Sequence, residues 1–290
     1  YAIKFEKEAE EGKYQYMVTD YPGTIGLRFN FINGGTSGLM SNVKIRKAIS
    51  YSIDREEMID AVYGRYNPAY SYVAPAITFN GSSYRSQVGE VIEDEYNEYV
   101  GDPDKIVALF QEGLDELGVE TPIEDITLTY LTSGSTTEVQ AEREYIQQSL
   151  EETLGLTVEL SVAGDNSLFI ADRNEGNYDF FLGGWYSDYN DPLDFLYTNY
   201  TDAYGMSFGG YSNTDYDALA DQLVGETDMD KRLDIYKQME QILLLDDCAF
   251  APIYYATKQV LLQNWVKDYR TSSFGASAEF IWTYIDGKNQ

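Results

Sequence analysis

One stretch of the chain, residues 174–230, concentrates the side chains from which a ligand site could be built. It holds twelve acids and thirteen aromatic residues in 57 positions, and no lysine or arginine. At its centre an apolar run ends in Gly183-Gly184 and is followed by the sequence WYSDY at 185–189. Aromatic walls with a few placed polar groups are typical of a small-molecule or peptide pocket. We therefore predict that this stretch carries the function.

The acids of this stretch also have structural explanations. Asp191 precedes a proline, which is typical of a helix N-cap with proline in the first turn. Asp188 lies too far upstream to cap that helix, although it could cap a turn. The spacing of Asp188, Asn190, Asp191 and Asp194 resembles that of a calcium-binding loop. The glycine and the distal glutamate of an EF-hand are missing, however, so we expect no metal. Trp185 could be a core residue.

The composition excludes several classes of chemistry. The 290 residues carry 49 acids, 20 bases and no histidine, for a formal charge of −29. A chain this acidic repels phosphate, so we expect no nucleic-acid partner. With no histidine and one cysteine, the chain cannot form His-dependent triads, Cys-rich zinc sites or internal disulfides. We interpret Cys248 as a small buried side chain, and we expect no cofactor and no catalytic residue.

Strands and helices alternate around the proposed site. Strands are predicted near residues 27–32, 126–130, 156–162 and 179–185, and helices near 102–117, 136–154, 168–174, 215–224 and 229–245. This alternation predicts an α/β fold built on crossover units. The β-rich region 250–285 has no helical partner nearby and is expected to complete the sheet begun by residues 1–33. Residues 67–100 show little periodicity and predict extended loops.

The block from Asn42 to Gly64 predicts two short helices. Asp54, followed by Glu57 three residues later, fits a capping box that restarts the helix, and Gly64 is placed to end it. Asp54 is therefore a cap and not a catalyst. The glycine cluster at 34–38 lacks the Lys-Ser/Thr of a phosphate loop and predicts a turn.

Several motifs resemble one known family, the family 5 extracellular solute-binding proteins, which include the oligopeptide- and dipeptide-binding proteins of ABC importers. The sequence VKIRKAISYSIDR at 43–55 resembles the V-R-x-A-I-x-x-A-I-D-R signature that opens the second lobe of these proteins. YD at 178–179, GWYSDY at 184–189 and DP at 191–192 are similar to the family's Y-D, G-W-x-x-D-Y and D/E-P motifs. Two helices within 216–245 and the sequence APIYY at 251–255 resemble its C-terminal region. The resemblance covers most of the chain.

The resemblance implies the C-terminal lobe of a two-lobed, periplasmic-binding-protein-like α/β fold of class II, with part of the first-lobe sheet. Residues 1–34 would be a remnant of the first lobe with a hinge strand. Residues 35–253 would be the second, ligand-binding lobe, and 254–290 the return strand and the C-terminal part of the first lobe. The chain opens with Tyr1, without a methionine, signal peptide or lipidation motif, so we expect a piece of a longer protein.

The resemblance also implies a receptor and not an enzyme. Such a receptor would be extracytoplasmic, either periplasmic or a cell-surface lipoprotein, and would act as a monomer that captures oligopeptides for an ABC permease. Asp188 matches the family's aspartate that pairs with the α-amino group of the peptide. The other expected ligand-binding residues are Trp185, Tyr186 and Tyr189, which would line adjacent pockets, and Tyr254 and Tyr255 on the hinge strand.

One position departs from the family pattern. Some members carry an arginine six positions before the aspartate, where it meets the ligand's carboxylate, and here that position is Leu182. Carboxylate recognition and peptide length therefore stay open. An oligosaccharide receptor of the same family is an alternative, because aromatics and acids also suit sugars. A secreted glycosidase with two acids across a cleft is another, but nothing in the spacing selects a pair from the 49 acids.

Overall fold

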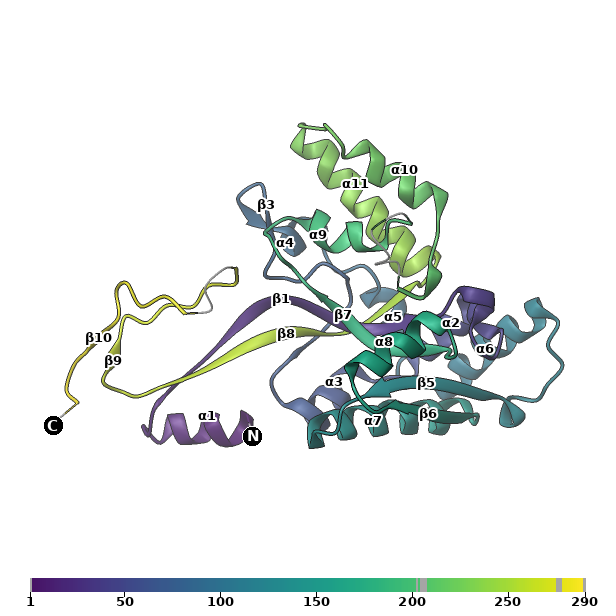
Figure 1. Ribbon diagram of the computed structural model, residues 1–290, viewed down its shortest axis with the longest axis horizontal. Helices are drawn as coiled ribbons and strands as arrows, with labels where there is room; N and C mark the ends of the chain where they lie inside the picture. Colours follow the sequence, from purple (N-terminus) through teal and green to yellow (C-terminus); the bar gives the residue numbers. More distant parts are fainter. Residues whose placement is uncertain (1, 202, 204–207, 275–277, 289–290) are drawn as a thin grey trace.

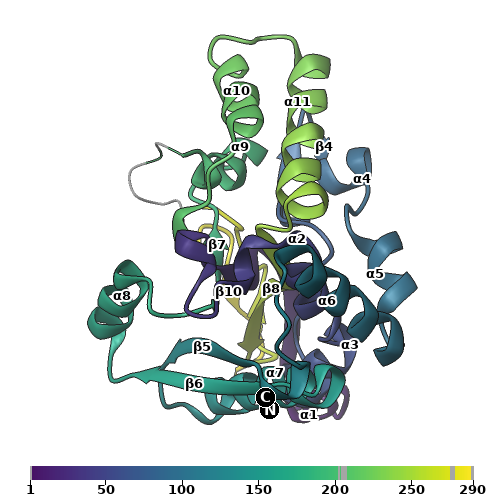
Figure 2. The same cartoon turned by 90° about the vertical axis from the view of Figure 1, so that its right-hand side faces the viewer.

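The computed structural model describes residues 2–201, 203, 208–274 and 278–288. Its centre is a six-stranded mixed sheet with helices on both faces (Figures 1 and 2). The strand order is β2-β8-β1-β7-β5-β6. The strands are β1 (Gln15–Phe29), β2 (Asn67–Pro68), β5 (Thr127–Ser133), β6 (Thr157–Ala163), β7 (Phe180–Tyr186) and β8 (Phe250–Leu262). The predicted α/β class is confirmed.

Crossover units build the parallel part of the sheet, as the alternation predicts. β5 pairs in parallel with β6 and with β7. The helix α7 (Thr137–Leu154) connects β5 to β6, and α8 (Asn166–Glu175) connects β6 to β7. The ends of α7 follow from its sequence: the side chain of Thr136 caps its first turn, and Gly155 ends it with a φ of 76°.

Strands β1 and β8 run antiparallel and continue beyond the sheet as a two-stranded ribbon (Figure 1). β1 pairs with β7 over residues 23–29 and with β8 over residues 15–28. The C-terminal strand thus completes the sheet that the N-terminal residues begin, as predicted. The β-rich end is only partly correct, because the described residues after Leu262 form just the two-residue strands β9 (Val266–Lys267) and β10 (Tyr284–Ile285). The helix α1 (Ala2–Glu10) lies near the far end of the ribbon.

Two hydrophobic cores occupy the two faces of the sheet. The first packs against α2 (Val43–Tyr51), α3 (Arg55–Met58), α6 (Pro103–Leu117) and α7. The second packs against α9 (Pro192–Leu196), α10 (Thr214–Gln222) and α11 (Met229–Gln241), which lie above the sheet in Figure 2. Tyr254 belongs to the first core and Tyr255 to the second, since successive strand residues point to opposite faces. In the described ranges no helix is long and apolar enough to span a bilayer.

The predicted pair of helices meeting at Asp54 is confirmed. The Asp54 side chain accepts a hydrogen bond from the Glu57 backbone N at 3.0 Å and caps α3. One π-turn follows (Ile59–Tyr63), and Gly64 ends it in the left-handed conformation with a φ of 61°. Asp54 is thus a structural cap in this fold.

The two arginines of the helical motif bind backbone carbonyls at the start of β8. Arg46 donates to the carbonyl oxygens of Asp247 and Cys248. Arg55, which is fully buried, donates from Nε to the carbonyl oxygen of Pro252 at 2.8 Å. These bonds supply the acceptors that a buried guanidinium needs. The motif therefore fastens α2 and α3 to a strand about 200 positions further along the chain. Cys248 is buried, as predicted, and burial raises its thiol pKa to about 11.

The glycine cluster at 34–38 forms the predicted turn, and Asp179 holds it. The Asp179 carboxylate accepts hydrogen bonds from Thr36 Oγ1 at 2.8 Å, Ser37 N at 2.9 Å and Thr129 N at 2.7 Å. Gly35 has a φ of 78°, and a Cβ there would lie 2.5 Å from Asp179 Oδ1. Asp179, the aspartate of the Tyr-Asp motif, therefore links this turn to the sheet through hydrogen bonds.

The prediction of extended loops over residues 67–100 is partly wrong. Two short helices lie there, α4 (Tyr84–Val88) and α5 (Glu93–Tyr99), with the small strands β3 (Thr78–Phe79) and β4 (Ser82–Ser83). α5 buries only Tyr96, so it has no apolar periodicity for a sequence pattern to report.

Candidate functional site

One buried carboxylate holds the loop that follows β7. Asp194, only 8% exposed, lies in the first turn of α9. Its Oδ2 accepts hydrogen bonds from Trp185 Nε1 at 3.0 Å, Ser187 Oγ at 2.7 Å and the Asp188 backbone N at 2.8 Å. These bonds orient the indole and fix the backbone at Asp188. The sequence suggested Asp194 only as a calcium ligand, although an acid three residues after the Asp191 cap could have been recognised as a first-turn acceptor.

The far end of this loop is tied to two other elements. Asn190 Oδ1 accepts a hydrogen bond from the Thr78 backbone N at 2.8 Å. Asp191 caps α9, as predicted, and its Oδ1 also accepts a hydrogen bond from the Tyr236 hydroxyl of α11 at 2.8 Å. The loop is therefore anchored on both sides of its tip.

Asp188 and Tyr189 form that tip. Both are exposed, Tyr189 by 48%. Within the described part of the chain, no hydrogen bond or ion pair is made by the Asp188 carboxylate. The fold thus presents a charged acceptor on a fixed backbone, next to an aromatic ring.

Tyr186 lines a cavity of about 390 Å³ beside the sheet. Its other walls are Tyr21 of β1, Tyr66 and residues 256–259 of β8. The Tyr186 ring, 49% exposed, lies across Gly23, where a Cβ would collide with it. The Nε2 atom of Gln259 is buried and has no hydrogen-bond partner among the described residues.

An aromatic stack backs this cavity. Tyr254, 7% exposed, stacks on Tyr66 with ring centroids 4.5 Å apart and an interplanar angle of 2°. Behind the stack, Glu142 of α7 accepts hydrogen bonds from the hydroxyls of Tyr63 and Tyr254. Burial raises the pKa of Glu142 to about 7, against the opposing effect of the Tyr254 bond. No sequence pattern points to Glu142, since its hydrogen-bond partners come from other elements.

Trp185 and Tyr255 lie on the other face of the sheet. Both pair in register with Thr24 of β1, so they share one row across the strands. Tyr255 is 4% exposed, and its hydroxyl donates to Glu90 Oε2 at 2.7 Å. The structure thus divides the six predicted residues into three pairs: Tyr186 with Tyr254, Trp185 with Tyr255, and Asp188 with Tyr189.

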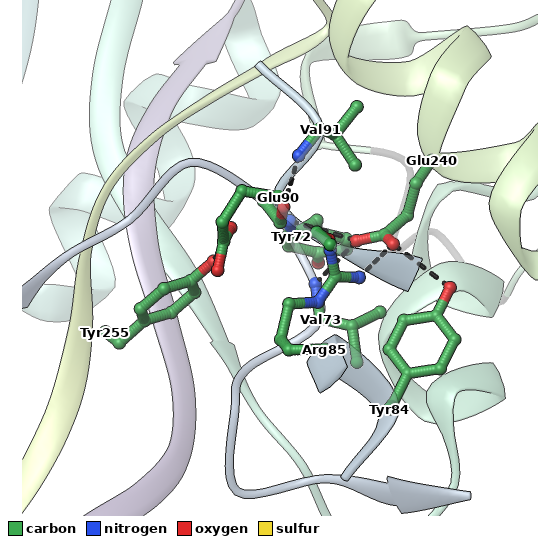
Figure 3. A network of polar contacts seen from close by, with 10 residues as sticks. Tyr72, Val73, Tyr84, Arg85, Glu90, Val91, Glu240 and Tyr255 are labelled. Carbon is green, nitrogen blue, oxygen red and sulfur yellow. Dashed lines mark hydrogen bonds and ion pairs between the residues drawn. The ribbon is translucent and has the colours of Figure 1, made fainter. Parts of the chain in front are cut away.

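A buried ion pair holds the segment 67–92 against α11 near Tyr255 (Figure 3). Glu240 is fully buried, and its Oε2 pairs with Arg85 and accepts a hydrogen bond from the Tyr84 hydroxyl at 3.0 Å. Its Oε1 accepts from the backbone N–H groups of residues 72 and 73 at 3.2 and 3.0 Å. This network holds the segment 67–92 in place, and Glu90 of that segment accepts the hydrogen bond from Tyr255.

A mixed sheet with helices on both faces carries here an anchored aromatic loop at a strand end and a cavity beside it, which is the arrangement in which open α/β sheets commonly hold ligands. The sequence model of the bacterial extracellular solute-binding proteins, family 5 (middle region), matches residues 2–207. The chain belongs to this family.

Two relatives are named as peptide-binding proteins. The oligopeptide-binding protein OppA of Bacillus subtilis (strain 168) is 31% identical over 237 residues, which is 79% of this chain and 39% of that protein. The dipeptide-binding protein DppE of the same organism is 30% identical over 249 residues, which is 85% of this chain and 42% of that protein. The chain therefore spans less than half the length of these relatives.

Solved structures show the same fold. Listeria monocytogenes OppA bound to peptide superposes with a TM-score of 0.75 and 29% identity over 96% of this chain and 52% of that one. The substrate-binding domain of an oligopeptide ABC transporter from Bacillus anthracis str. Ames gives a TM-score of 0.79 at 24% identity, with the same coverage. The fold class implied by the resemblance is confirmed.

Proposed function

We propose that this chain is part of an extracytoplasmic receptor that captures oligopeptides for an ABC importer, and that Asp188 pairs with the α-amino group of the peptide. The observation that carries the proposal is the loop after β7. Asp194 fixes the backbone at Asp188, and the Asp188 carboxylate lies exposed at the tip. The names of the relatives support peptides as the ligand class.

A carboxylate on a fixed backbone suits recognition of an ammonium group. A charge-assisted hydrogen bond is stronger than a neutral one, and a preorganised acceptor reduces the entropy lost on binding. Trp185, Tyr186 and Tyr189 would contact the first side chains of the peptide. Tyr254 and Tyr255, which are buried on opposite faces of the sheet, would complete the site from β8 by supporting the residues around them. Leu182 offers no cation, so the ligand's carboxylate would be met elsewhere.

The test is Asp188→Asn in the full-length protein. Affinity for free peptides should fall by about 2 to 4 kcal/mol, as when one partner of a desolvated charge pair is truncated. Peptides with an acetylated N-terminus should bind weakly to the wild type and lose nothing further in the variant. Asp215→Asn removes an equally exposed charge from α10 and serves as control. Calorimetry that finds unchanged affinity in Asp188→Asn would remove Asp188 from the site.

We further propose the two-lobed arrangement, with residues 1–34 and 254–290 in the first lobe and 35–253 in the second. It is supported by the exposed apolar side chains at 280–282, beyond the β1–β8 ribbon, which a first lobe would cover. The receptor would act as a monomer that is periplasmic or anchored to the cell surface as a lipoprotein.

A further inference from the structure

Glu142 is a partly buried carboxylate that pairs with no cation among the described residues. Its hydrogen bonds come from two neutral groups, the hydroxyls of Tyr63 and Tyr254. Within the described ranges it takes part in no ion pair. Arg65 lies in the same cluster but pairs with Glu138, one turn earlier on α7. A charge removed from water is costly unless an opposite charge compensates it. A cationic group of a ligand could supply the opposite charge that Glu142 lacks.

The cluster around Glu142 adjoins the cavity. Tyr66 stacks on Tyr254 and also lines the cavity, together with Tyr186. The Tyr66 ring already takes a cation, since Arg65 Cζ lies 4.6 Å from its centroid. Tyrosine faces attract ammonium and guanidinium groups. The titratable and charged groups around Glu142 and the cavity are Tyr21, Tyr63, Arg65, Tyr66, Glu138, Tyr186, Tyr254 and Lys258, and Lys258 itself lines the cavity.

We propose that the cavity between Tyr66 and Tyr186 receives a basic side chain of the bound peptide, and that Glu142 provides its counter-charge. Glu142 is then a specificity-determining residue of the site. This inference rests on the proposed peptide-binding function and assigns one ligand class within it. The chain charge of −29, with no base between residues 174 and 230, adds long-range attraction for basic peptides.

The proposal implies coupling between binding and protonation. Burial raises the pKa of Glu142 to about 7, so near pH 7 about half of the free receptor carries a proton there. An ammonium group beside Glu142 favours the ionised form. Binding of a basic peptide at pH 7 should therefore release about half a proton, whereas a neutral peptide of the same shape should release none.

The experiment compares lysine with norleucine, its uncharged analogue of similar length, in the full-length protein. Alanine-based tri-, tetra- and pentapeptides carry one or the other at each position, and affinities are measured by calorimetry at pH 8. At one position the lysine peptide should bind about tenfold more tightly. Glu142→Gln should abolish this preference, measured as the ratio of lysine-peptide to norleucine-peptide affinity within the variant. Glu144→Gln removes an exposed charge two residues along α7 and should keep the preference.

Proton release is measured by repeating the titrations at pH 7 in buffers of different ionisation enthalpy. Equal affinities for lysine and norleucine peptides at every position would overturn the proposal, as would a preference that survives Glu142→Gln or binding without proton release. If neither set of peptides binds, the proposed peptide-binding function itself is wrong. Failure of the inference is thereby distinguished from failure of the function.

Discussion

The Glu240 carboxylate is fully buried and the Glu142 carboxylate is partly buried, and their surroundings differ. Glu240 is compensated by a buried arginine, a tyrosine hydroxyl and two backbone N–H groups. Glu142 has only tyrosine hydroxyls. The Glu240 network joins α11 to the segment 67–92 (Figure 3), whereas Glu142 lies behind the aromatic wall of the cavity.

The difference separates two uses of a buried charge. A carboxylate whose acceptor sites are filled from within the chain stabilises one arrangement of the chain and has little left to offer a ligand. A carboxylate without a cation keeps a strong attraction for one, at a cost in stability. Uncompensated groups beside cavities are therefore the better candidates for ligand contacts.

The largest expected effect is on the compensated network. Arg85→Met leaves Glu240 buried without its cation and should lower the free energy of unfolding by about 3 to 5 kcal/mol, measured by urea denaturation. Lys44→Met breaks two surface ion pairs, with Glu112 at an N–O distance of 2.7 Å and with Glu116 at 2.8 Å, and should cost less than about 1 kcal/mol. Equal losses in the two variants would contradict the compensation described for Glu240.

The opposite sign is expected at Glu142. The folded-state pKa of about 7 lies above the ordinary value of 4.5, so the folded chain holds the proton more tightly and stability falls as pH rises between these values. Glu142→Gln removes this loss. From pH 5 to pH 8 the variant should gain about 2 to 3 kcal/mol over the wild type in denaturation experiments. A difference that does not change with pH would show that Glu142 titrates normally.

The smallest of the three effects is expected at Asp194, whose carboxylate is bound by three neutral donors. Asp194→Asn should lower the free energy of unfolding by about 1 to 2 kcal/mol, since hydrogen bonds to a charged acceptor are replaced by neutral ones. Peptide affinity of the full-length variant should fall as well, because the backbone at Asp188 is released. Unchanged peptide affinity together with a lower free energy of unfolding would mean that peptide binding does not depend on the hydrogen bonds from Asp194 to this loop.

Local signals explain what the sequence could predict. Asp54, Thr136 and Asp191 cap helices through groups two or three residues away, and Gly64 and Gly155 end them by their own backbone conformation. Such interactions lie within a short window of sequence. Most helices and the longer strands were therefore predictable, whereas α1, α4 and α5 were not.

The site depends on partners that are distant in sequence. Glu240 and its hydrogen-bond partners are separated by 155 to 168 positions, and Glu142 lies 79 positions from Tyr63. No pattern in a single sequence reports such pairs. The loop at 184–191 is predictable because its aromatics and acids are contiguous and resemble a family motif. The role of Asp194, which fixes this loop, follows only from its hydrogen bonds in the folded structure.

The arginines of α2 and α3 have a consequence for the order in which this lobe can fold. During synthesis Arg46 and Arg55 emerge 201 and 197 residues before the carbonyl groups of Asp247 and Pro252 that they bind. Until that late segment is made, the guanidinium groups lack their acceptors and the first core lacks part of β8. Long-range pairing of this kind slows folding and leaves partly folded chains exposed to aggregation. The first core therefore remains incomplete until residues 247–252 have been translated.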